Sequence, residues 1–591
     1  MDRGSLRIFL LIAAGAFLLM TVLPSMFGNG ESTQPLTAEG NTAATTRAPE
    51  KVCDIWSESF RAQLSSRSAT VKRFQLLTAK YRHEGKPIEL GTTPDVEDRR
   101  QLRLNYRNPT TGVKEDEWLV KTDLLDFEIV GSTRTSCEFL YRDERAEIRE
   151  TIRATGRPYE LEATATITNK ANRPLTHAVT AHTDAWRYEH ETKGHMFSVS
   201  PLVTHVECIA DDGSAERVRI EDFEASDFEN RELFPKNALN GGDWFETRQK
   251  PALAAVSNAY FSQALVPLSA PASAVCQLQI EDRWDSRAYP DKSRDPHAGA
   301  MYRARLAYPA KALAPGASDT FSFLTYVGPK ERSVLSGAGG GGHRLIDLID
   351  LGFFSAIAKV LVAFLLKVYS IIPNWGIAII VLTITARLLL FPLALPSIKS
   401  MIKMRELKPE MDALNEKFKD DAQAKGLAQM ELWRKHNVNP LKGCLPQLAS
   451  MPVWFALYTT LQTAVELYNI PFLWFPDLSA PDPLFILPFV IGGTSFIQQK
   501  MMPLQGDPAQ QKMMLYFMPA MFMVFMLFLP AGLGVYMFTN GVLGIIQQQA
   551  VEWHAKRALG QSGGGKGSGT GAKGGDIKVE VVGEKKKKIN A

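Results

Sequence analysis

Apolar residues gather in the last third of the chain, in stretches that carry almost no charge. Residues 443–465, 483–499 and 513–551 contain no Asp, Glu, Lys or Arg, and residues 368–398 contain a single charge, Arg387. A helix of about 20 residues is long enough to cross the ~30 Å hydrocarbon layer of a bilayer. The sequence therefore predicts a polytopic α-helical membrane protein.

Six spans account for the apolar stretches. Pro530-Ala531-Gly532 divides the longest stretch into a hairpin with a tight turn, and residues 8–27 form a further apolar segment near the start. That segment is predicted to be an N-terminal anchor, and a cleaved signal peptide is the alternative. The predicted spans are residues 1–27, 373–398, 443–466, 483–501, 513–530 and 532–551, the last five forming a helical core.

Residues 353–372 are apolar as well, but Ser355, Lys359, Lys367 and Ser370 fall in one stripe of a helix. Such a pattern is typical of an amphipathic helix lying on a membrane surface. The charges of the loops indicate whether this helix crosses the membrane, because positively charged loops stay in the cytoplasm. Residues 399–442 hold ten Lys and Arg, whereas residues 467–482 hold none. Six spans place every basic loop inside, and a seventh at residues 353–372 would invert this order.

The orientation assigns each remaining segment to one side of the membrane. Both termini, a helical hairpin at 399–442 and a short loop at 502–512 are predicted to be cytoplasmic, and the loop at 467–482 lies outside. The tail, 552–591, is rich in Gly and Lys and carries a run of four lysines at 585–588, so we expect it to be disordered.

An exported domain of about 280 residues follows the first span. Tyr159, Leu161, Ala163, Ala165 and Ile167 alternate with polar residues, and residues 274–280 repeat the pattern. A period of two predicts half-buried strands, so residues 51–335 are expected to form one large antiparallel β-sandwich. Gly- and Ser-rich segments at 28–50 and 336–352 are predicted to be a linker and a flexible joint.

Arg387 is the most informative polar residue, because it lies within the span 373–398. A guanidinium facing lipid near the centre of a helix costs about 2.5–3.5 kcal/mol, so it must face protein or water. No span offers a buried acid as a partner, which favours an aqueous cavity within the membrane. Further polar residues are biased toward the inner half and predict a groove open to the cytoplasm: Thr383, Gln447, Ser450, Gln498, Gln499, Thr539, Asn540 and 547–549.

Catalytic and metal motifs are weak in this chain. The cluster His182, Asp184, His190, Glu191 and His195 has its last two histidines five residues apart, whereas a helical zinc site needs four. Nucleotide-binding and nucleophile motifs are lacking, so we predict no enzyme, cofactor or metal. A membrane-anchored carbohydrate enzyme and a solute transporter or channel with a midplane Arg are the alternatives.

Four cysteines lie in the predicted exported domain, where oxidation is permitted. The sequence leaves open whether they form disulfides or remain buried thiols, and it does not fix a pairing. They are Cys53, Cys137, Cys208 and Cys276.

The core motifs resemble the YidC family of membrane-protein insertases. The resemblance covers residues 352–552 in order, and it rests on these segments: Asn374-Trp375-Gly376, Arg387, Phe391-Pro392-Leu393, Asn439-Pro440-Leu441, Gly443-Cys444-Leu445-Pro446, Met451-Pro452, Asp477-Leu478-Ser479-Ala480, Phe517-Met518-Pro519 and Ile545-Ile546-Gln547-Gln548-Gln549. An anchor followed by a large exported domain is similar to the Gram-negative form of the family, whose periplasmic domain is a β-super-sandwich without known sugar chemistry.

The resemblance implies an inner-membrane insertase and assembly chaperone for integral membrane proteins. Its groove would comprise Arg387, Thr383, Gln447, Ser450, Gln498 and Asn540. Met451, Pro452 and Tyr536 would contact the client helix, and Met537 stands where the enterobacterial pattern has a second tyrosine. Implied partners are nascent integral membrane proteins, the Sec translocon, membrane lipids, and the ribosome through the basic tail and cytoplasmic loops.

Overall fold

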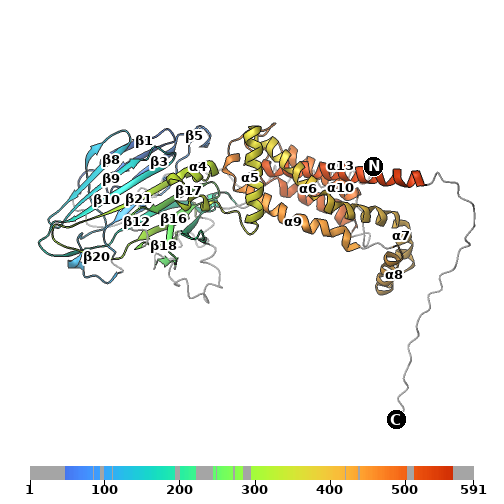
Figure 1. The fold of residues 1–591 in the computed structure, drawn as a ribbon, viewed down its shortest axis with the longest axis horizontal. Coiled ribbons are helices and arrows are strands. Elements are labelled where there is room, and N and C mark those ends of the chain that lie inside the picture. Colours follow the sequence, from blue (N-terminus) through green and yellow to red (C-terminus); the bar gives the residue numbers. More distant parts are fainter. Residues whose placement is uncertain are drawn as a thin grey trace, which may run out of the picture.

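The computed structural model describes residues 47–562 except 84, 94–98, 109–110, 193–199, 221–243, 248, 270–272, 284–294, 419–420, 437–439 and 502–510. Of residues 422, 440–450, 555, 556 and 558–562 it describes the backbone only. The predicted anchor at 1–27, most of the linker at 28–50, the loop at 502–510 and the tail from 563 lie outside the described residues. Figure 1 shows two parts, a β domain at one end and a bundle of helices at the other.

Two antiparallel sheets form the β domain. Residues from both sheets share one hydrophobic core, so the prediction of a large sandwich is confirmed. The nine-stranded sheet has the order β14 (Ala215–Val218), β13 (His205–Ala210), β16 (Pro251–Ser257), β17 (Phe261–Pro267), β21 (Ser318–Pro329), β10 (Glu160–Asn169), β9 (Ala146–Ala154), β8 (Ser136–Arg142) and β7 (Glu128–Ser132). The five-stranded sheet has the order β15 (Phe245–Glu246), β18 (Val275–Arg283), β19 (Gly299–Ala307), β12 (Thr180–Tyr188) and β6 (Arg103–Asn105).

Smaller elements complete the domain. A three-stranded sheet joins β1 (Val52–Trp56), β2 (Phe60–Ser65) and β3 (Val71–Leu76), and two ribbons pair β4 (Arg82–His83) with β5 (Lys86–Pro87) and β11 (Leu175–His177) with β20 (Lys311–Leu313). The short helices are η3 (Glu115–Glu117) and α2 (Glu189–Thr192).

The predicted alternation in β10 is borne out. Leu161, Ala163, Ala165 and Ile167 are buried, while the threonines between them lie on the other face of the sheet and are more exposed. On that face three pairs of hydroxyl groups bridge β10 and β21, including Thr164 with Ser322. The period of two therefore reports one face in the core and one toward solvent.

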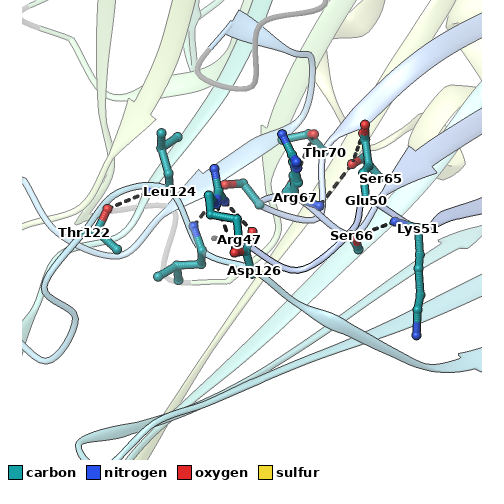
Figure 2. A network of polar contacts seen from close by, with 12 residues as sticks. Arg47, Glu50, Lys51, Ser65, Ser66, Arg67, Thr70, Thr122, Leu124 and Asp126 are labelled. Carbon is teal, nitrogen blue, oxygen red and sulfur yellow. Dashed lines mark hydrogen bonds and ion pairs between the residues drawn. The ribbon is translucent and has the colours of Figure 1, made fainter. Parts of the chain in front are cut away.

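The chain enters the sandwich through a network of polar contacts (Figure 2). Arg47 pairs with Asp126, and the Glu50 carboxylate accepts a hydrogen bond of 2.6 Å from Ser65 Oγ. Glu50 also pairs with Arg100 at 2.8 Å. The end of the predicted linker is therefore fixed on the sandwich.

Two disulfides answer the question that the sequence leaves open. Cys53 is bonded to Cys137, and Cys208 to Cys276. The first bond links β1 to β8, and the second links β13 in one sheet to β18 in the other. Both are therefore placed to hold separate layers of the domain together.

The prediction of a flexible joint at 336–352 is wrong for this structure. The segment forms α4 (Arg332–Gly337), η8 (Ala338–Gly341) and η9 (Arg344–Leu348), whose apolar residues belong to the sandwich core. Gly339 N donates to Glu160 Oε1 at 2.8 Å, and Lys330 Nζ donates to Leu348 O at 2.9 Å. Composition indicated a linker, but apolar side chains between the glycines anchor the segment.

The helical part begins with α5 (Ser355–Ile371), which crosses the other helices at the end nearest the sandwich (Figure 1). Lys359, Lys367 and Ser370 are exposed, while Val362 and Leu365 are buried. The amphipathic pattern is therefore realised as one packed face and one open face. The remaining elements are α6 (Trp375–Glu406), α7 (Lys408–Lys417), α8 (Ala422–Lys435), α9 (Pro440–Gln462), η10 (Val465–Leu467), α10 (Ile486–Met501), η11 (Met513–Phe517), α12 (Met518–Met526) and α13 (Ala531–Ser562).

Helices α6, α9, α10 and α13 run along the long axis of the molecule, and α7 and α8 form the predicted hairpin at the far end (Figure 1). Among the described helices, α6 is the one that is both long and apolar enough to cross a membrane by itself. The six spans therefore stay a prediction. Helix α6 continues beyond the predicted end at 398, because Pro392 and Pro396 are accommodated within it.

Candidate functional site

The half of the helical core nearest the sandwich is filled with apolar side chains. Leu382 of α6, Leu457 of α9, Ile491 of α10 and Tyr536 of α13 are all less than a tenth exposed and belong to one cluster. Polar residues begin directly beyond this cluster, on the next turns of α6 and α13. The bundle is therefore apolar and closed toward the sandwich, and polar further away.

Arg387 of α6 is the centre of these polar residues. Its Nε donates to Asn540 Oδ1 at 2.6 Å, and one terminal nitrogen donates to the backbone oxygen of Asn540 at 2.8 Å. The other terminal nitrogen donates to Gln547 Oε1 at 3.2 Å. Gln498 of α10 donates to Gly541 O at 3.0 Å on the same stretch of α13. We call Arg387, Gln498, Asn540 and Gln547 the Arg387 cluster.

Neutral amides hold the guanidinium, and they add no negative charge beside it. Among the described residues, no carboxylate lies within ion-pair distance of Arg387. Helices α6 and α13 do form an ion pair, between Arg405 and Glu552 at 2.8 Å, but it lies several turns further toward the far end.

Gly544 is a member of this site that the sequence reasoning missed. A Cβ atom there would lie 2.7 Å from Gln498 Nε2 and 3.1 Å from a terminal nitrogen of Arg387. Only a residue without a side chain allows α6, α10 and α13 to approach each other at this point. A glycine one turn beyond Asn540 on the predicted span is the signal that could have revealed it.

Several predicted groove residues have other surroundings. Thr383 is fully buried and its hydroxyl donates to Ile379 O at 2.7 Å within α6, so it does not face a groove in this structure. Thr539 likewise bonds to Val535 O at 2.7 Å. Gln447 and Ser450 lie on α9, outside the residues whose side chains are described. The structure thus brings Arg387, Gln498 and Asn540 together, and not Thr383.

The predicted client-contact residues differ in exposure. Met451 of α9 is 42% exposed, and Pro452 beside it is partly exposed. Tyr536 is 6% exposed and packs within the apolar cluster, so it is not accessible in this conformation. Met537 is partly exposed on the next position of α13.

The polar cluster of the sandwich is divided in two. His182 and Asp184 are buried on β12, and Asp184 lies 3.5 Å from Arg303. Burial, together with neighbouring arginines, holds the pKa of His182 well below its usual range, and burial raises the pKa of Asp184. His190 and Glu191 lie instead on the surface helix α2, and His195 is outside the described residues. Within the described part of the chain, no three His, Cys, Asp or Glu side chains are grouped as metal ligands.

Comparison with known proteins covers both parts of the chain. The family model of the YidC periplasmic domain matches residues 53–364. The family model of the 60Kd inner membrane protein matches residues 367–558. A membrane protein insertase YidC of Anaeromyxobacter dehalogenans (strain 2CP-C) is 36% identical over 514 residues, which cover 86% of this chain and 87% of that protein. The chain belongs to the YidC family. Its relatives in that family carry the name membrane protein insertase, and the family is an inner membrane one with a periplasmic domain.

Other proteins of the family match a smaller or larger share of the chain. The insertase of Geobacter sp. (strain M21) is 44% identical over 247 residues, covering 42% of this chain and 45% of that protein. Among solved structures, YidC from Thermotoga maritima is 13% identical and covers 84% of this chain and 98% of its own, with a TM-score of 0.28. A galactose mutarotase-like protein from Lactobacillus casei is 11% identical and covers 47% of this chain and 100% of its own, with a TM-score of 0.30.

Proposed function

We propose that the Arg387 cluster receives the polar segment that a client protein must carry across the membrane during insertion. The observation that carries this proposal is the guanidinium of Arg387, held by two amide side chains and facing no described carboxylate. Electrostatic attraction is weakly screened in a low-dielectric site. A cation held in this way attracts an acidic or polar segment without being neutralised beforehand.

The apolar half of the bundle supports a direction for this process. Because the side nearest the sandwich is filled, a polar segment reaches the cluster from the opposite side, where α7 and α8 lie. Together with the charge of the loops, this supports six spans with both termini in the cytoplasm and the sandwich in the periplasm. The groove then comprises Arg387, Gln498 and Asn540, with Gln447 and Ser450 on α9.

The client's apolar helix is proposed to leave along α9. Met451 is exposed and Pro452 partly exposed on this helix beyond the apolar cluster, where a neighbouring helix can pack against them. Moving apolar residues into lipid supplies the free energy, since Leu or Ile gains about 0.5 kcal/mol at the centre of a helix. Neither a nucleotide nor another cofactor is needed for this step.

Further partners follow from charge and from the family. The basic tail and cytoplasmic loops are proposed to bind the polyanionic surface of the ribosome, in a manner that salt weakens. Cooperation with the Sec translocon and contact with membrane lipids along α5 are parts of the same proposal.

Site-specific photocrosslinking to a stalled nascent chain tests the proposed path. A photoreactive residue at Met451 or Gln498 should crosslink to the client. The same probe at Phe353, which is 93% exposed and lies two residues before α5, serves as the control for lipid-facing positions. Crosslinks that are stronger at position 353 than at 451 and 498 would place the client elsewhere.

A further inference from the structure

The loop that joins α9 to α10 is held by the sandwich through a buried ion pair. Arg332, at the start of α4, donates from its side chain to Glu466 Oε2 at 2.9 Å and from its backbone to Oε1 at 3.1 Å. The two side chains are 11% and 5% exposed. Lys80 Nζ of the sandwich also donates to Glu466 O at 3.2 Å. A carboxylate from the helical part is therefore bound within the β domain.

Tyr468 extends this contact with an aromatic side chain. Its ring lies among those of Tyr81, Tyr260 and Phe261, with centroid distances of 6.2, 5.7 and 6.1 Å. Aromatic groups at such distances contribute beyond the area that they bury. Asn469 then donates to the backbone oxygens of Lys80 and Arg82 at 2.9 and 2.8 Å. Three nearly consecutive loop residues thus use an ion pair, ring packing and backbone hydrogen bonds to fix the loop.

The same loop contacts the first residues of α6 and α13. Phe472 packs so closely on Gly376 of α6 that a Cβ atom there would lie 2.2 Å from its ring. Gly532 N and Ala531 N, at the start of α13, donate to Leu478 O and Ala480 O, each at 2.8 Å. The loop therefore lies between the sandwich and the ends of two helices.

These two helices carry the Arg387 cluster. From Gly376 to Arg387 the distance along α6 is about 16 Å, and from Gly532 to Asn540 along α13 it is about 12 Å, at 1.5 Å rise per residue. Helices transmit a rotation or shift of one end to the other over such short lengths. The geometry of the Arg387–Asn540 contact therefore depends on how the loop holds the two helix ends.

We propose that Glu466 and Tyr468 are positioning residues, which bind the sandwich to the helical core as one body and hold the outer ends of α6 and α13 together. The sandwich thereby keeps the bundle closed at its own end while a polar segment occupies the Arg387 cluster. This structural role goes beyond the proposed function, and the restraint itself does not depend on it.

Spin-label distance measurements on the full-length protein in lipid test the restraint. One label replaces Arg149, exposed on β9, and the other replaces Ile546, 55% exposed on α13, in a background with Cys444→Ser. The variants are Glu466→Arg, Arg332→Glu, their combination, Tyr468→Ala and Tyr468→Phe. The matched control is Glu162→Arg, which breaks the Arg153–Glu162 pair at 2.8 Å on the sandwich surface.

The unmodified protein should give one narrow distance distribution. Glu466→Arg and Tyr468→Ala should broaden it at least twofold, whereas the charge exchange, Tyr468→Phe and the control should stay narrow. Unchanged widths in Glu466→Arg and Tyr468→Ala would overturn the proposal, as would a charge exchange that stays as broad as the single variants. If Glu466→Arg fails to fold, Tyr468→Ala against Tyr468→Phe decides alone.

Insertion of a client protein supplies the second readout. Variants that broaden the distribution should insert clients several-fold more slowly, with recovery in the charge exchange. Broad distributions with normal insertion would overturn the positioning role. Failure of the proposed function is recognised separately, because insertion would then be insensitive to changes of Arg387 itself while the spin-label distances still respond to the junction variants.

Discussion

Arg332 and Arg387 are both partly removed from solvent, but their guanidinium groups meet different partners. Arg332 pairs with the carboxylate of Glu466, which neutralises its charge and fixes a junction between two parts of the chain. Arg387 is held by the amides of Asn540 and Gln547, which fix its position without adding a negative charge. An arginine side chain can therefore join two segments or present a charge, depending on its partner.

The largest effect is expected from breaking the junction pair. Glu466→Ala leaves Arg332 buried and unpaired, and removal of one partner from a buried pair costs about 3–5 kcal/mol. Glu162→Ala, in the exposed pair with Arg153, should cost about 0–1 kcal/mol. Denaturant unfolding of the purified protein in detergent measures both. Equal losses would show that the Arg332–Glu466 pair is no more important than a surface pair.

Asn540→Asp should convert Arg387 into a residue that resembles Arg332. The new carboxylate would lie beside the guanidinium and compete with an acidic client segment. A loss of about 1.4 kcal/mol in attraction corresponds to a roughly tenfold lower insertion rate, and folding should be unaffected. Insertion of clients with acidic and with neutral translocated segments, followed by protease protection, measures the effect. Undiminished insertion of the acidic client would contradict the need for a free charge.

Gly544→Ala should disturb the Arg387 cluster by crowding. Its Cβ would lie 2.7 Å from Gln498 Nε2, and overpacking of this kind costs typically 1–3 kcal/mol. Gly493→Ala in α10 is the matched control, because its Cβ would meet nothing within 4 Å and Ala favours a helix. Thermal unfolding in detergent should separate the two variants. If Gly493→Ala is the more destabilising variant, the close approach of the helices at Gly544 does not contribute to stability.

The smallest effect is expected from the lysines of residues 563–591. Removal of these residues should weaken ribosome binding at low salt, and the difference should vanish at high salt because salt screens the attraction of cations to a polyanion. Cosedimentation with ribosomes over a salt series measures it, with Arg387→Ala as the control that leaves binding unchanged. Equal binding of intact and shortened protein at low salt would leave the tail without this role.

Local patterns predicted most elements of this fold. The period of two in β10 and the polar stripe of α5 each report one buried face, which is why the sequence located them. The segment at 336–352 was wrongly predicted to be flexible because of its high glycine content. Its apolar side chains pack on a distant part of the chain. The two disulfides join residues 84 and 68 positions apart, and such pairings depend on tertiary contacts that no local pattern reveals.

Only some residues of the candidate site could be predicted from the sequence. Arg387 was recognisable because a charge within an apolar span is costly, and Asn540 and Gln498 because they are polar within spans. Thr383 was misplaced, since a hydroxyl can bond to its own helix and then needs no groove. Gly544 and the contacts of Glu466 depend on how helices approach other elements, which spacing along one helix does not show.

The proposed function depends on the charge of Arg387, and substitutions at this position separate the effect of the charge from that of the side-chain shape. Arg387→Lys keeps the charge and loses the planar fork, whereas Arg387→Ala and Arg387→Glu remove or reverse the charge. The measurement is protease protection of two client types, with acidic or neutral translocated segments, in cells depleted of the native protein and at matched insertase levels. We predict that Lys retains much of the activity, and that Ala and Glu slow acidic clients several-fold more than neutral ones. Equal behaviour of the Ala and Lys variants on acidic clients would show that the charge of Arg387 does not attract the client segment.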